Sequence, residues 1–170
     1  MNQLLSHKLS IIAFAVCMIA MPVAAIADSS AAEPSIVGRW VSFVQSPIGT
    51  SYALWTFFPG GLTTEDNSGT ILRTASQGEW IQVGPSDYIR SQVYLTFDAP
   101  RTSTGFTKIT NFIQLNEAGD EGDAEGFVEV YDVNGNLTAT RITTVHTRRC
   151  TMAMTLPQCI GVAPLTKSSP

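Results

Sequence analysis

The sequence has little of what enzyme sites are usually built from. Two histidines, His7 and His146, and three cysteines occur in 170 residues. No segment matches the Gly-x-Ser-x-Gly elbow, the P-loop, the dinucleotide fingerprint or the His-Glu-x-x-His zinc motif. The sequence therefore gives no support to a hydrolase or a nucleotide-binding protein, and we expect no cofactor and no metal site.

Positive charge is also scarce. Lys and Arg number 10 against 14 Asp and Glu, which gives a formal net charge of −4 at pH 7. Nucleic acids and anionic membrane surfaces are bound by clusters of positive side chains. We therefore expect no nucleic acid and no anionic membrane as a partner.

No apolar run has the length of about 20 residues that a membrane-spanning helix needs. The apolar run from Ile11 to Met21 follows Lys8, and the segment ends in Ala25-Ile26-Ala27, a small-x-small cleavage pattern. Residues 1–27 are therefore predicted to be a signal peptide, and residues 28–35 a flexible leader. We expect a secreted or periplasmic protein with no membrane insertion after removal of the signal.

Two cysteines remain once Cys17 leaves with the signal peptide. Cys150 and Cys159 form an even pair, and the compartment reached by export is oxidising. We predict a disulfide between them. It holds down the C-terminal segment, residues 150–170.

Helical periodicity is absent from the rest of the chain. Runs of β-branched and aromatic residues alternate with turn signals instead, as in all-β proteins. Closure into a barrel removes exposed sheet edges, and Asn134-Gly135 predicts a tight hairpin between the last two strands. We predict one all-β domain over 36–149, an antiparallel up-and-down barrel of about eight strands. The predicted strands are 36–45, 51–58, 62–74, 77–83, 87–97, 105–116, 126–132 and 137–149.

A β-sandwich of the same strands is the alternative fold. Its immunoglobulin version places two cysteines on separate strands around a core tryptophan, whereas both cysteines here follow the last strand. The acidic stretch 117–125 lacks the ligand spacing of an EF-hand. We predict a solvated hairpin loop there, since acidic and glycine residues suit exposed turns.

Gly38-Arg39-Trp40, at the head of the first predicted strand, resembles the opening of calycin barrels, the lipocalin and avidin-type proteins. The segments TFFPGG, QGEW and DVNGN are similar to those of small secreted bacterial lipocalin-like proteins and of allene oxide cyclase-type barrels. The resemblance covers about residues 36–149. It implies that Trp40 closes one end of the barrel, with an arginine from the last strand packed over it.

Two arginines are candidates for this contact with Trp40. Antiparallel pairing of the first and last strands places Arg148 or Arg149 beside the indole, as structural residues. Arg141 lies about 23 Å further along the strand, at about 3.3 Å per residue, and belongs near the opposite rim. Gly78-Glu79-Trp80 repeats the Gly-x-Trp spacing, and we interpret it as a packing element.

Strand alternation does not show which side chains point into the barrel. Tyr88, Arg90 and Tyr94 share one face of their strand, opposite an aliphatic face. Either the aliphatic faces point inward and enclose an apolar cavity, or the polar faces do. With Trp40, these three residues are the candidate ligand-binding residues. Glu129 and His146 form a candidate proton-transfer pair if they face inward, and are ordinary surface groups otherwise.

Three functions follow from the resemblance. The first is binding of a small, mostly apolar molecule inside a lipocalin-like barrel, as a monomer or a homo-oligomer. The second is a cofactor-independent isomerase or cyclase. The third is a periplasmic protein-binding or inhibitor module, although lipocalin-like inhibitors of metalloproteases place their disulfide elsewhere.

Overall fold

The computed structural model describes residues 34–69, 71–98 and 102–161. The predicted signal peptide lies outside these residues, as do most of the predicted leader and the end of the C-terminal segment. Eight strands and one short helix make up the described part of the chain. They are β1 (Gly38–Ser46), β2 (Gly49–Phe57), β3 (Leu62–Asn67), β4 (Ser76–Gln82), β5 (Asp87–Phe97), β6 (Ser103–Leu115), β7 (Glu121–Tyr131), β8 (Leu137–Arg149) and α1 (Leu156–Ile160).

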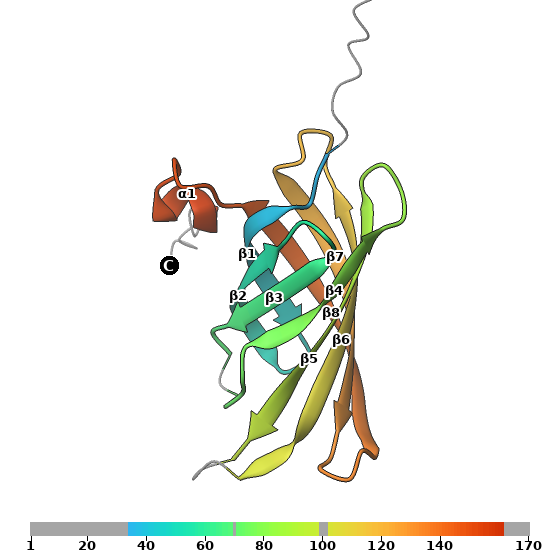
Figure 1. Cartoon of the computed structure of the whole chain (residues 1–170). Coiled ribbons are helices and arrows are strands. Elements are labelled where there is room, and N and C mark those ends of the chain that lie inside the picture. Colours follow the sequence, from blue (N-terminus) through green and yellow to red (C-terminus); the bar gives the residue numbers. More distant parts are fainter. Residues whose placement is uncertain (1–33, 70, 99–101, 162–170) are drawn as a thin grey trace, which may run out of the picture. The chain divides into compact units, whose positions relative to one another are not determined.

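The strands form one closed barrel in chain order, and each strand is antiparallel to its neighbours (Figure 1). The barrel closes where β1 pairs with β8, with Trp40 opposite Arg149 and Gln45 opposite Thr144. This confirms the predicted eight-stranded, up-and-down, all-β barrel, which has the architecture of lipocalin-like proteins. No helix among the described residues is long and apolar enough to cross a membrane.

Two strand boundaries differ from the predicted ones by more than two residues. β3 ends at Asn67, where the prediction continued to residue 74, because the Asn67 side chain accepts a hydrogen bond from the Gly69 N–H at 2.7 Å and turns the chain. β7 begins at Glu121, so the predicted acidic loop over 117–125 is wrong in its second half. There acidic residues alternate with the small, buried Gly122, Ala124 and Gly126. This period of two is typical of a strand.

In each Gly-x-Trp segment another part of the chain comes so close to the glycine that a larger side chain would not fit. Gly38 has a φ of 134°, and a Cβ there would lie 2.8 Å from Nη1 of Arg149. At Gly78 a Cβ would lie 2.0 Å from the backbone oxygen of Ser91 on β5. The first glycine therefore admits an arginine over the barrel end, and the second brings β4 close to β5.

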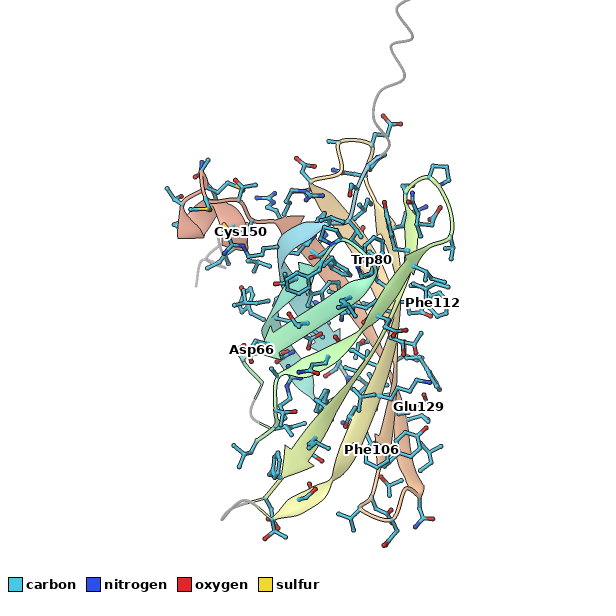
Figure 2. All side chains as sticks on the ribbon, viewed as in Figure 1. Asp66, Trp80, Phe106, Phe112, Glu129 and Cys150 are labelled. Atoms are coloured by element: carbon cyan, nitrogen blue, oxygen red, sulfur yellow. A yellow bond between two sulfur atoms is a disulfide. The ribbon has the colours of Figure 1, made fainter. Side chains whose placement is uncertain are left out.

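Apolar side chains fill the end of the barrel where β1 begins. Trp40 is buried there, and its indole N–H donates to the Ile36 carbonyl at 2.8 Å. Trp55, Phe57, Trp80 and Tyr88 continue the cluster through a chain of edge-on ring contacts, and Figure 2 labels Trp80 among them. This end is a packed core.

The disulfide between Cys150 and Cys159 is present, as predicted. It encloses the start of α1, which packs against β1 and β8. The Cys150 N–H also donates to the Arg39 carbonyl at 2.8 Å. Residues 150–161, the described part of the C-terminal segment, are thereby held against the strands that close the barrel.

Candidate ligand cavity

The middle of the barrel interior is polar. On β5 the inward positions are Tyr88, Arg90, Gln92 and Tyr94, of which the first three are buried. On other strands of the barrel the inward residues Glu65, Ser76, Asn111 and Thr147 are also buried. A row of polar side chains therefore lies beyond the aromatic core.

Glu65 is the centre of this polar group, and its side chain is 5% exposed. Its Oε2 accepts a hydrogen bond from Nη2 of Arg90 at 2.9 Å and another from Nε2 of Gln92. Its Oε1 accepts one from Nη2 of Arg73 at 3.2 Å. One carboxylate therefore holds two guanidinium groups.

Arg90 is held by hydrogen bonds and by an aromatic ring. Its Nε and Nη2 donate to Oδ1 of Asn111 at 3.2 and 2.7 Å, and its guanidinium carbon lies 3.7 Å from the centroid of the Trp55 ring. Burial lowers the pKa of Arg90 to about 10, although the Glu65 charge opposes the shift. Arg90 is therefore charged at neutral pH and joins the polar group to the aromatic core.

A cavity of about 240 Å³ lies at the end of the barrel away from Trp40. Its walls come from the β1–β2 turn, from the segment that follows β3, and from inward residues of β5 to β8. Apolar side chains there are Val44, Ile48, Ile71, Ile109 and Val128, and charged ones are Glu65, Arg73 and Arg141. Figure 1 shows β5 to β8 extending past β1 to β4 at this end.

Arg73 connects the polar group to the cavity. Its side chain is 9% exposed, and its guanidinium carbon lies 4.3 Å from the centroid of the Tyr94 ring. Its Nη1 is buried and makes no hydrogen bond to any described residue. Arg73 is thus held by Glu65 on one side and by an aromatic face on the other.

The structure brings some of the predicted ligand-binding residues together and separates others. Tyr94 lines the cavity, and Arg90 lies in the polar group next to it. Tyr88 belongs to the aromatic core, where its hydroxyl donates to the Pro34 carbonyl. Trp40 lies at the closed end of the barrel.

Glu129 and His146 both face outward and do not meet. Glu129 pairs in register with Thr140, and His146 with Asp123. Glu129 contacts Lys108 at 3.7 Å and accepts a hydrogen bond from the Tyr131 hydroxyl, and Figure 2 shows it on the outer side of the sheet. His146 is 55% exposed and lies 2.9 Å from Oδ1 of Asp123. Strand polarity thus differs around the barrel: β5 turns Arg90 and Gln92 inward, whereas β7 turns Glu129 and β8 turns His146 outward.

A second hollow, of about 720 Å³, lies on the outer surface of the barrel. Its apolar side chains include Phe43, Ile89 and Phe112, and its polar rim includes Glu125 and His146. Phe112 is 53% exposed and points away from the barrel in Figure 2.

The sequence reasoning missed Glu65, Arg73 and Asn111. Glu65 and Arg73 lie in the run that looked least like a strand, where neighbouring acidic and polar residues hide the alternation. Asn111 sits on the aliphatic face of its strand, as the polar residue between Ile109 and Ile113. A polar residue at an otherwise apolar inward position was the available signal.

Comparison with known proteins adds no relative: no protein-family model matches the chain, and no curated protein matches it.

Proposed function

We propose that this chain is an exported binding protein of lipocalin-like type that holds a small organic molecule in the cavity opposite Trp40. The observation that carries the proposal is the cavity of about 240 Å³, whose walls combine apolar side chains with polar and charged ones. In ligand sites, apolar walls bury the ligand and placed polar groups orient it. The volume is below the usual range of about 300–1,000 Å³, which indicates a small ligand.

Export is part of the proposal. A disulfide persists in oxidising compartments, and Cys150 and Cys159 are bonded. The small-x-small pattern before Asp28 supports removal of a signal peptide. Either the periplasm or the outside medium would satisfy both observations.

Native mass spectrometry of the protein purified from its own host tests the proposal. We expect an added mass that is released on denaturation. Ile109→Trp, which fills the cavity, should remove this mass, whereas Thr110→Trp, the next residue and outward-facing, should retain it. A folded protein without added mass, in every fraction, would contradict binding.

An isomerase or cyclase requires a group that acts on the reacting atoms. Glu129 and His146, the pair considered from the sequence, are outside the barrel and apart. We expect Glu129→Gln and His146→Ala to leave ligand binding within about twofold of the parent. Turnover of a polyene or epoxide that His146→Ala abolishes, with binding retained, would favour the enzyme instead, because acid–base groups contribute about 10²- to 10⁴-fold in rate.

A protein-binding role is the second candidate, favoured by the outer hollow. Exposed apolar patches of this kind mark interaction surfaces. Phe112→Asp should then prevent partner cross-linking and leave the added mass unchanged. Leu54→Asp, at another exposed apolar position, is the matched control.

A further inference from the structure

The inference concerns the charge of the cavity ligand, and it rests on the proposed function. Among the described residues, the charged side chains that line the cavity or lie directly beneath it are Glu65, Arg73, Arg90 and Arg141. Three are cationic and one is anionic. The region therefore has an excess of positive charge that no further carboxylate among the described residues balances. A buried charge is unfavourable unless it is paired.

Both oxygens of the Glu65 carboxylate are engaged. One of its oxygens takes Arg73, and the other takes Arg90 and Gln92. Nη1 of Arg73 and Nη1 of Arg90 are both buried without a hydrogen-bond partner among the described residues. Buried donors are nearly always satisfied in native proteins, so two orphaned guanidinium nitrogens indicate a missing acceptor.

Of the two arginines bonded to Glu65, Arg73 is the one that a ligand can reach, because it lines the cavity and Arg90 does not. Only its Nη2 is bonded, to Glu65. Nη1 of Arg73 is therefore the donor for which a ligand acceptor is missing. Planar guanidinium groups recognise carboxylates through paired N–H donors.

Arg141 provides a second cation at the same cavity. It faces inward on β8, next to Thr143, and is partly exposed. No ion pair joins it to any described carboxylate. Apolar side chains, among them Ile48, Ile71 and Val128, lie beside serine, threonine and asparagine side chains in the remaining walls.

We propose that the ligand is a small amphipathic organic anion, with its negative group held by Arg73 and Arg141 and its apolar part against the isoleucine and valine walls. A carboxylate supplies the acceptor that Nη1 of Arg73 lacks and balances the excess charge. The mature protein is acidic overall, so the attraction is local to the cavity.

Isothermal titration calorimetry with octanoate and 1-octanol tests the charge, since the two probes differ in the head group and share the chain. We expect octanoate to bind at least about tenfold more tightly, the size of one hydrogen bond to a charged group. Arg73→Met should remove most of the preference for octanoate and leave the affinity for 1-octanol unchanged. Arg141→Met should weaken octanoate in the same direction.

Arg39→Met is the matched control, because Arg39 is exposed on β1 and outside the cavity. It removes one positive charge and should leave both affinities unchanged. Circular dichroism melts confirm that each variant is folded, and Arg141→Met keeps the test valid if Arg73→Met fails to fold.

The outcomes separate this inference from the proposed function. Equal binding of octanoate and 1-octanol would overturn the anion inference and leave the binding cavity in place. If neither probe binds, the anion inference as stated is overturned. The presence or absence of a retained mass in the native protein then tests the proposed function. If acetate or sulfate binds as tightly as octanoate, the cavity is a site for free anions. That result would overturn the inference that the ligand is amphipathic.

Discussion

Arg149 lies over Trp40, with the guanidinium carbon 4.4 Å from the centroid of the indole. The same guanidinium donates to the Val37 carbonyl at 2.6 Å, to the Gly119 carbonyl at 2.9 Å and to the Ser35 carbonyl. One side chain therefore joins the last strand to the chain before β1 and to the β6–β7 turn. Partial burial lowers the pKa of Arg149 below its ordinary value.

We expect Trp40→Ala to reduce the free energy of unfolding by about 3–5 kcal/mol, the usual range for a buried large aromatic side chain. The change leaves a cavity and removes the surface on which Arg149 stacks. Equilibrium denaturation in urea measures it. A loss below about 1 kcal/mol would mean that the indole does not close the barrel.

Glu65→Gln should destabilise the protein more than Arg73→Met does. The first change leaves two buried arginines without a carboxylate, and breaking a buried ion pair in this way costs about 3–5 kcal/mol. The second change leaves Glu65 paired with Arg90. Denaturation of both variants under the same conditions gives the comparison, and equal losses would argue against the central role of Glu65.

Thiol labelling without reductant should modify neither Cys150 nor Cys159 in the exported protein. Replacing both by serine should destabilise the protein by up to about 2.5–3 kcal/mol, from the entropy of a loop of this length. A melt of the double variant checks this value. Labelling of both thiols in the native protein would contradict the bridge.

Asp132 gives a prediction that depends on pH. Its carboxylate accepts bonds from the Asn136 side chain and backbone and from the Asn134 backbone, and these lower its pKa from the ordinary value of 3.8. The charged form therefore stabilises the hairpin above the unfolded pKa, and this contribution is lost as the pH falls through the lower folded pKa. An NMR titration should show the lowered pKa, and Asn136→Ala should raise it toward 3.8.

Much of the fold could be predicted from local patterns. Asn134-Gly135 marked the β7–β8 hairpin correctly, since tight hairpins need residues that tolerate positive φ. Antiparallel closure of β1 on β8 placed Arg148 and Arg149 beside the first strand, and Arg149 is the one over Trp40. Arg148 bonds instead to Glu121 on β7.

The interior could not be predicted because alternation gives two faces and does not say which one points inward. The inward set on β5 has Arg90, whereas the inward set on β6 has Ile109, Asn111 and Ile113. Partners such as Glu65 come from another strand, and only the register joins them. A charge on a strand is therefore ambiguous until its cross-strand neighbours are known.

The closing pair of strands also sets how the chain reaches its native state. Ser42 Oγ and Thr147 Oγ1 lie 2.8 Å apart across β1 and β8, although 105 residues separate them in sequence. Chains dominated by such distant pairings fold slowly, because the loop must close before any contact compensates its entropy. Until then both strands present open edges to other chains. Refolding should therefore be slow, with a yield that falls as the protein concentration rises.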